Sequence, residues 1–279
     1  MDLSDVRASG NSQTALLLVY TDKGAEILET KFNEWYDEEH IPRLLLFPGC
    51  TRASRYRAID SKPPPWTALY HLDSPEIPES REWYQLNEQA SDNEKTILGS
   101  IPIVTRSIYT MFHGSHAKDI PHHSAGKVAC IVHLQIKSRD FDVLLDSSRE
   151  QADLEAKFKL WHRNFITRGV STTPGWVRST MYTRYSGSDM RTTPELKIAM
   201  DCQLLVIHEW DENGDAMEIS KLEANVAAQV QIWEKENLCD LVSLDDHRSW
   251  LIFSDNRSVY FSGVSYLCCH GRCDSLIQT

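Results

Sequence analysis

His40 is the residue of this sequence that type and spacing best equip for chemistry. It follows Tyr36 by four residues in the stretch Phe32–Tyr56, FNEWYDEEHIPRLLLFPGCTRASRY, so both side chains fall on one face of a predicted helix. Imidazole titrates near neutral pH and can take a proton from a small substrate and return it. We predict that His40 is a general acid/base with Tyr36 beside it, and the preceding Glu38 and Glu39 could orient its ring. The alternative is that His40 caps the C-terminal end of the helix, where positive charge is favourable.

Further side chains that could contact a substrate lie on predicted strands. Tyr70 and His71 are consecutive, and because side chains alternate along a strand, only one of them can face a given side of the sheet. We predict a catalytic role for His71. The predicted substrate-binding residues are Tyr56, Tyr70, Arg55 and Tyr109. An arginine at such a site could hold a carboxylate or phenolate through two hydrogen bonds. The alternative for these residues is structural, as buried core aromatics, a buried histidine or a surface arginine.

The remaining histidines and cysteines do not predict a metal site. His113, His116, His122 and His123 fall in a polar stretch, and the C-terminal run Cys268–Cys273 reads CCHGRC. Neither spacing matches a fixed-geometry metal site. The sequence also contains no Walker, Rossmann or EF-hand pattern and no HExxH or GxSxG motif. We therefore expect neither a metal nor an organic cofactor.

The elements that must position these residues are encoded twice. The segment Phe158–Tyr182, FKLWHRNFITRGVSTTPGWVRSTMY, aligns with Phe32–Tyr56 without a gap. The identical positions, by their first-copy numbers, are Phe32, Trp35, Pro48, Gly49, Arg52 and Tyr56. Six matches in register indicate an internal duplication whose halves share one plan. Since Ile166 aligns with His40 and His162 with Tyr36, we predict that catalysis belongs to the first copy.

Apolar patterns predict the order strand, helix, strand, strand, helix, strand in each copy. In the first copy the expected strands are 15–20, 51–57, 66–72 and 103–112, and the expected helices are 25–39 and 79–90. In the second copy the expected strands are 128–136, 177–185, 202–210 and 247–253, and the expected helices are 154–166 and 216–235. Pro42 cannot continue the first helix, but it can open a short second turn through Leu46, because a first-turn position has no intrahelical N–H bond to lose.

These elements predict an α+β fold of two ferredoxin-like βαββαβ repeats. The first repeat is expected to cover residues 14–112 and the second 127–253, joined by a linker at 113–126 and followed by a poorly ordered tail at 254–279. Each antiparallel sheet would carry two helices on one face and leave an apolar face bare. We expect the bare faces to meet as an intramolecular pseudo-dimer, an α+β barrel with a small-molecule-sized interior. A further homodimer is left open.

The composition excludes several classes of partner. A formal net charge of −11 argues against nucleic-acid binding, which needs a positive surface. No apolar run approaches the roughly 18 residues of a membrane span. The N-terminal MDLSDVRASGNSQ lacks the basic and apolar regions of a secretion signal, so the seven cysteines are expected to be reduced thiols. These features predict a cytoplasmic protein that contacts neither membrane nor nucleic acid.

The residues FNEWYDEEHIPRLL, followed by PG and a strand bearing Arg and Tyr, resemble the EthD-type branch of the dimeric α+β barrel superfamily. Members of that branch carry a W-Y-x-x-E-H-x-P-like motif on the first helix. The resemblance is strong over residues 14–112 and weaker over 127–253, so the chain resembles a tandem version of what is usually a homodimer. The superfamily includes polyketide cyclases, muconolactone isomerases, cofactor-independent monooxygenases, haem enzymes and stress-responsive proteins.

The resemblance and the residues together predict a cofactor-independent lyase, cyclase or isomerase. Its substrate would be a small hydrophobic, phenolic or polyketide-like metabolite of secondary metabolism, and His40 would act as general acid/base. One alternative is a cofactor-free monooxygenase of the antibiotic-biosynthesis type, which oxygen consumption would distinguish. The other is a non-catalytic, stress-responsive binding or assembly protein, whose barrel would be filled by its own side chains.

Overall fold

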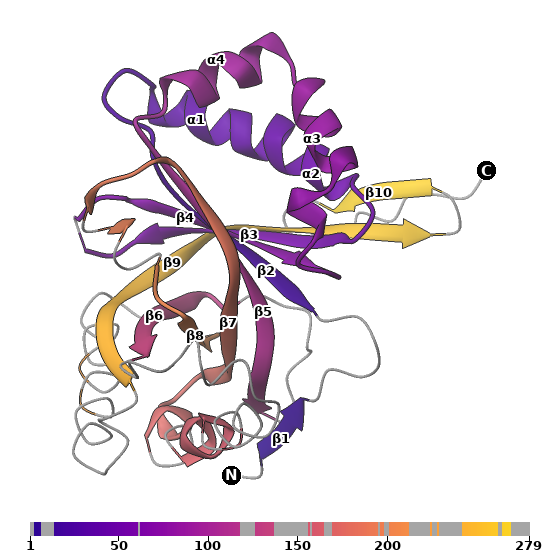
Figure 1. Cartoon of the computed structure of the whole chain (residues 1–279). Helices are drawn as coiled ribbons and strands as arrows, with labels where there is room; N and C mark the ends of the chain where they lie inside the picture. Colours follow the sequence, from indigo (N-terminus) through magenta and orange to yellow (C-terminus); the bar gives the residue numbers. More distant parts are fainter. Residues whose placement is uncertain are drawn as a thin grey trace.

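The computed structural model describes residues 3–6, 14–60, 62–117, 126–136, 156, 158–164, 169–194, 196–197, 201–211, 224, 228, 242–261 and 264–268. Over these residues the chain has a mixed α+β fold built on one strongly curled antiparallel sheet (Figure 1). Helices of the first repeat cover the outer surface of the sheet at one end, and a helix of the second repeat, described over 158–164, lies at the opposite end.

Eight strands close into a ring. The first repeat supplies β2 (Ala15–Asp22), β3 (Cys50–Ala58), β4 (Trp66–Leu72) and β5 (Ile103–Ala117). The second supplies β6 (Val128–Ile136), β7 (Trp176–Arg191), β8 (Leu204–Trp210) and β9 (Val242–Phe261). The strands are paired in the order β5-β2-β4-β3-β9-β6-β8-β7, and β7 pairs with β5 again. Because the ring closes, its eight strands leave no free edge among themselves.

Each repeat has the ferredoxin-like strand order that the duplication predicts. Numbered within its repeat, the fourth strand lies next to the first, then the third, then the second, in β5-β2-β4-β3 and again in β9-β6-β8-β7. The junctions are the pairs β3–β9 and β5–β7, both antiparallel. The two sheets are therefore joined edge to edge by backbone hydrogen bonds, in addition to facing each other across the barrel.

The helices of the first repeat differ from the predicted ones at two points. The first point is the link between the first helix and the turn that Pro42 was expected to open: α1 (Glu29–Trp35) continues without a break through a π-helical turn, η1 (Tyr36–His40), into that turn, α2 (Ile41–Leu45). Pro42 is tolerated because it lies in the first turn of α2, where its missing N–H leaves no hydrogen bond unmade. The second predicted helix, 79–90, is a 3₁₀ turn, η2 (Ile77–Glu79), followed by α3 (Arg81–Glu88) and α4 (Asp92–Ser100).

The predicted linker and tail are partly strand. The linker was expected at 113–126, yet β5 runs to Ala117, and its last residues pair with β7 and with β1 (Leu3–Val6). In the expected tail, β9 runs to Phe261 and β10 (Val264–Cys268) pairs back onto it. These strands are therefore longer than the apolar segments that predicted them, because backbone hydrogen bonds to neighbouring strands continue beyond those segments. The predicted helix 216–235 lies outside the described residues except for 224 and 228, which are helical.

The repeated Pro-Gly dipeptides mark a turn that only glycine makes easily. Gly49 has a φ of 86° and Gly175 a φ of 72°, in the left-handed region that disfavours other residues. A Cβ on Gly49 would also lie 2.5 Å from Cδ1 of Ile77. This turn delivers the chain from α2 into β3, which carries Arg55.

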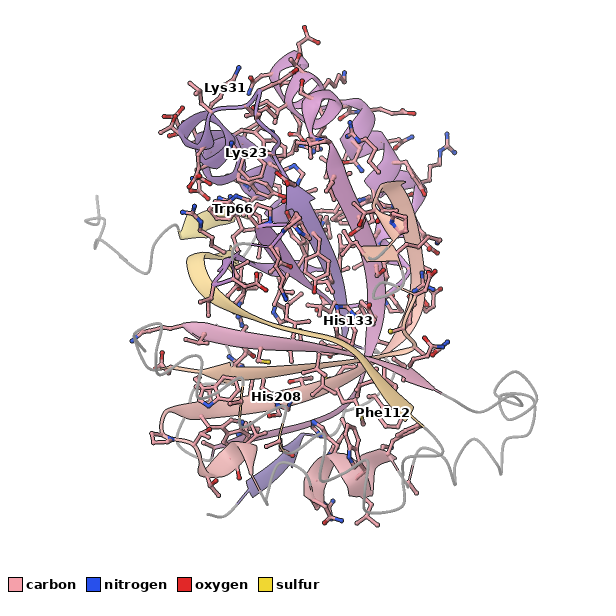
Figure 2. All side chains as sticks on the ribbon, turned by 90° about the vertical axis from the view of Figure 1, so that its left-hand side faces the viewer. Lys23, Lys31, Trp66, Phe112, His133 and His208 are labelled. Atoms are coloured by element: carbon pink, nitrogen blue, oxygen red, sulfur yellow. The ribbon has the colours of Figure 1, made fainter. Side chains whose placement is uncertain are left out.

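The described side chains pack into three core clusters. One lies between the first sheet and its helices, and a second lies between the second sheet and its helix. The third fills the barrel interior and comprises Leu16, Leu18, Tyr20, Tyr56, Leu69, Tyr109, Ala129, Ile131, Tyr182, Leu205 and Ile207. Figure 2 shows this layered arrangement, with Trp66 of β4 in the upper part of the view, His208 of β8 and Phe112 of β5 in the lower part, and His133 of β6 between them. None of the described helices is long and apolar enough to cross a membrane.

Candidate functional site

The sheet divides the predicted site residues into two groups. Tyr56 and Tyr109 belong to the barrel-interior cluster, and strand alternation places His71 on the same side, because its neighbour Tyr70 packs with the helices. Arg55, next to Tyr56, faces the helices as well. The barrel interior is packed with side chains and crossed by a hydrogen bond of 3.0 Å between Tyr20 Oη and His133 Nε2. The expected small-molecule-sized interior is therefore not seen among the described residues, and this packing is what the non-catalytic alternative predicts for the barrel. His71, Tyr56 and Tyr109 are therefore separated from the group under the helices, and their roles stay predictions.

His40 forms a buried polar pair with Glu94. The π-helical turn of η1 re-phases the helix so that the His40 ring points towards α4, a geometry often found at functional sites. His40 Nδ1 lies 2.8 Å from Glu94 Oε1, and Glu94 is 0% exposed. Arg43, one turn further along, binds the same carboxylate, with 3.1 Å between Nε and Oε2 and a second contact from Nη2 to Oε1. His40 therefore does not cap a helix C-terminus. It lies within the continuous helical segment and bonds a carboxylate.

The electrostatics of this pair favour a neutral imidazole and an ionised carboxylate. Burial alone would raise the pKa of Glu94, but His40 and Arg43 outweigh it and the pKa of Glu94 is lowered. Burial lowers the pKa of His40, against the opposing effect of Glu94. At neutral pH, Nδ1–H then donates to Glu94, and Nε2 carries a lone pair. This is the protonation state of a general base.

Tyr36, Tyr70 and Arg55 surround this pair from the helix and the sheet. The guanidinium carbon of Arg55 lies 4.0 Å from the centre of the Tyr36 ring. Arg55 donates to Asp37 Oδ1 at 3.2 Å and to Asn33 Oδ1 at 2.8 Å. Burial raises the pKa of both tyrosines, so they are neutral donors at physiological pH. Arg55 thus fastens α1 and η1 to the sheet and is already bonded to protein acceptors.

Two buried hydrogen-bond donors lie beside His40. The ring centre of His40 lies 4.7 Å from that of Trp35, 5.2 Å from that of Tyr36 and 6.3 Å from that of Tyr70. Trp35 Nε1 makes no hydrogen bond to the described residues. Tyr70 Oη makes none of ordinary geometry there, although it interacts with the Tyr36 hydroxyl and opposes the larger effect of burial on the pKa of Tyr36. Buried polar atoms are rarely left unpaired in native proteins, and an oxygen atom of a bound ligand could accept a hydrogen bond from either donor.

The structure thus brings together four of the predicted residues: His40, Tyr36, Tyr70 and Arg55. It adds Glu94 and Arg43, which sequence reasoning missed. A signal for Glu94 was present, because Ser91-x-x-Glu94 is a capping-box pattern, and Ser91 Oγ accepts from Glu94 N–H at 3.0 Å. That pattern predicts a helix start but does not predict burial against His40.

The second repeat holds the corresponding positions with different chemistry. His162 occupies the position of Tyr36 on the helix. By strand register, His208 occupies that of Tyr70 and Met181 that of Arg55. The rings of His162 and His113 lie 5.2 Å apart, and neither nitrogen of His162 makes a hydrogen bond to the part of the chain that the structure describes. The described residues form no group of three or more ligands that could hold a metal ion.

Solved structures support the fold assignment. An anthrone oxidase-like protein superimposes with a TM-score of 0.53 at 10% identity, covering 91% of this chain and 96% of its own. A candidate chlorite dismutase gives a TM-score of 0.51 at 10% identity, with 87% and 96% covered. A candidate monooxygenase from Fusobacterium nucleatum gives 0.50 at 8% identity, with 91% and 97% covered. These likenesses show that the chain shares the α+β barrel fold of the three structures. No protein-family model and no curated protein sequence matches the chain.

Proposed function

We propose that this chain is an EthD-type enzyme that moves a proton on a small hydrophobic metabolite of secondary metabolism, as a cofactor-independent lyase, cyclase or isomerase. The observation that carries the proposal is the His40–Glu94 pair, in which Glu94 is fully buried, next to two buried donors, Trp35 Nε1 and Tyr70 Oη, that make no hydrogen bond of ordinary geometry to the described residues. Aromatic rings of Trp35 and Tyr36 surround the imidazole. These surroundings suit an aromatic or polyketide-like substrate that carries a carbonyl or phenolic oxygen.

Each residue has a separate part in the proposed reaction. His40 Nε2 removes a proton from a phenolic oxygen or from a carbon next to a carbonyl group, and negative charge develops on the substrate oxygen. Tyr70 O–H and Trp35 N–H donate to that oxygen, and such preorganised donors stabilise developing charge. Glu94 fixes the tautomer of His40 and stabilises the imidazolium until the proton is returned. Arg43 holds Glu94 in place.

A second candidate is a cofactor-free monooxygenase that begins with the same proton abstraction. It is favoured by two of the similar structures, which are named an anthrone oxidase-like protein and a candidate monooxygenase. In this version the substrate anion would react with dioxygen. The two candidates share His40 as base and differ only in whether oxygen is consumed.

Anthrone is a suitable probe, because its methylene group lies between two aromatic rings and across the central ring from a ketone. Full-length protein should exchange the methylene protons of anthrone for deuterium in D₂O, followed by NMR in the absence of oxygen. His40→Ala should lower the protein-dependent rate by about 10²- to 10⁴-fold, the usual contribution of a general base. His162→Ala, at the position of the second repeat that aligns with Tyr36, should leave the rate within a few-fold of wild type.

An oxygen electrode then decides between the candidates. Uptake of dioxygen that depends on both anthrone and His40 would favour the monooxygenase, and proton exchange without uptake would favour the lyase, cyclase or isomerase. If His40→Ala retains the full exchange rate and remains folded by circular dichroism, the catalytic assignment of His40 is wrong.

A further inference from the structure

Both arginines of the first-repeat site are already bonded to protein acceptors. Arg43 pairs with Glu94 and also donates to Leu86 O at 2.8 Å. The Arg55 side chain, 1% exposed, pairs with Asp37 and lies against the ring faces of Tyr36 and Trp66. A negatively charged substrate group would have to displace one of these carboxylates to reach a guanidinium.

The charges of the site therefore cancel. Arg43 is matched by Glu94 and Arg55 by Asp37, and burial keeps His40, Tyr36 and Tyr70 neutral. Glu39 adds a further carboxylate nearby, bonded to Ser91 and Asn93 of the α4 N-terminal region. The chain as a whole carries a net charge of −11, which repels anions at longer range. Desolvating an anion here without a free cation would be unfavourable.

We infer that this site selects uncharged substrates, such as neutral phenols, enols and ketones, over their carboxylated, sulfated or phosphorylated analogues. Asp37 is the specificity-determining residue, and it acts through Arg55 by occupying the guanidinium that would otherwise bind an anion. The inference rests on the proposed function and narrows its substrate class. It also replaces the expectation that Arg55 binds a substrate carboxylate or phenolate.

Isothermal titration with a matched pair of probes tests the inference. 4-Hydroxyacetophenone and 4-hydroxybenzoate have nearly the same shape, but near neutral pH the first is predominantly neutral and the second is an anion. Wild-type protein should bind the neutral probe at least about tenfold more tightly, a difference of roughly 1.4 kcal/mol. Asp37→Asn keeps an acceptor for Arg55 but removes the charge, so it should bind the anion several-fold more tightly and the neutral probe as before.

Glu29→Gln is the matched control. It removes one negative charge from the same helix, from an exposed pair with Arg57 at 3.1 Å, so it should leave the preference of wild type unchanged. Equal or tighter binding of 4-hydroxybenzoate by wild type would overturn the inference and leave the proposed function standing. An unchanged preference in Asp37→Asn would overturn the role of Asp37. Failure to bind either probe would count against the proposed function itself.

Discussion

Structurally equivalent positions in the two repeats hold side chains of different chemistry. The first repeat gathers Tyr36, Tyr70 and Arg55 between helix and sheet. The second repeat places His162, His208 and Met181 at the corresponding positions. The first cluster contains the guanidinium of Arg55, whose charge Asp37 balances. The second contains two neutral imidazoles beside the thioether of Met181. The fold alone therefore does not determine what the space between helix and sheet contains.

The comparison indicates that the buried arginine occurs only in the repeat that also supplies its hydrogen-bond acceptors. Arg55 bonds Asp37 and Asn33 on the helix above it. The aligned residues in the second repeat are Arg163 and Lys159, neither of which can accept a hydrogen bond through its side chain. Met181 is fully buried there, so the loss of the arginine and the loss of its acceptors belong together.

Replacing Met181 by arginine and, in a separate variant, Arg55 by methionine gives the largest expected difference in stability. Met181→Arg buries a cation without a facing carboxylate on the helix, and it should lower the free energy of unfolding by about 3–5 kcal/mol. Arg55→Met removes a paired charge but keeps apolar volume, and it leaves Asp37 partly exposed to water, so the loss should stay below about 2 kcal/mol. Urea denaturation measures both. Equal losses would show that the two environments do not differ as described.

Acid should loosen both repeats through their buried imidazoles. Burial holds the pKa of His71 in the first repeat and of His162 in the second well below the ordinary value of 6.5, and it lowers the pKa of His208 to about 3. As the pH falls below 6.5, the unfolded chain binds protons that these native imidazoles do not bind, so the free energy of unfolding falls. At pH 5 each of these three imidazoles should cost about 2 kcal/mol. The lowered pKa of Glu94 acts only below about 4.5, in a window that begins at lower pH.

Hydrogen exchange by mass spectrometry locates the effect of acid. At pH 5, after correction for the intrinsic exchange rate, peptides from 66–72, 158–164 and 204–210 should be less protected than at pH 7. His162→Phe, which replaces the imidazole by an apolar ring, should restore part of the protection of 158–164. Protection at pH 5 equal to that at pH 7 in these peptides would contradict the account of the buried imidazoles.

The strands were the most predictable part of the molecule. β4 and β6 have the predicted bounds, because each is a continuous apolar run between residues that favour turns. The π-helical turn was not predictable, because it depends on the hydrogen bond from Ile41 N–H to Tyr36 O and leaves no periodic signal. Pro42 predicted the short turn that α2 forms, but not that the helix would continue into this turn without a break.

The sequence predicted only those site residues that a local sequence pattern identifies. The sequence identifies His40, Tyr36 and Tyr70 as candidates, and alternation requires Tyr70 and His71 to face opposite sides. Their choice of side could not be predicted, because both faces of this strand are buried and apolar. Glu94 lies 54 residues from His40, and only the packing of α4 against η1 brings them together.

The central claim, that Glu94 tunes His40 as the base of the first repeat, is tested most directly by the pH dependence of proton exchange on anthrone. In wild type the rate should rise with pH and level off with a midpoint below 6.5, because the pKa of His40 is lowered. Glu94 raises that pKa through its hydrogen bond and charge, so Glu94→Gln should move the midpoint to lower pH and reduce the plateau. A midpoint that stays in place in folded Glu94→Gln protein, or a rate that does not depend on pH, would contradict the account.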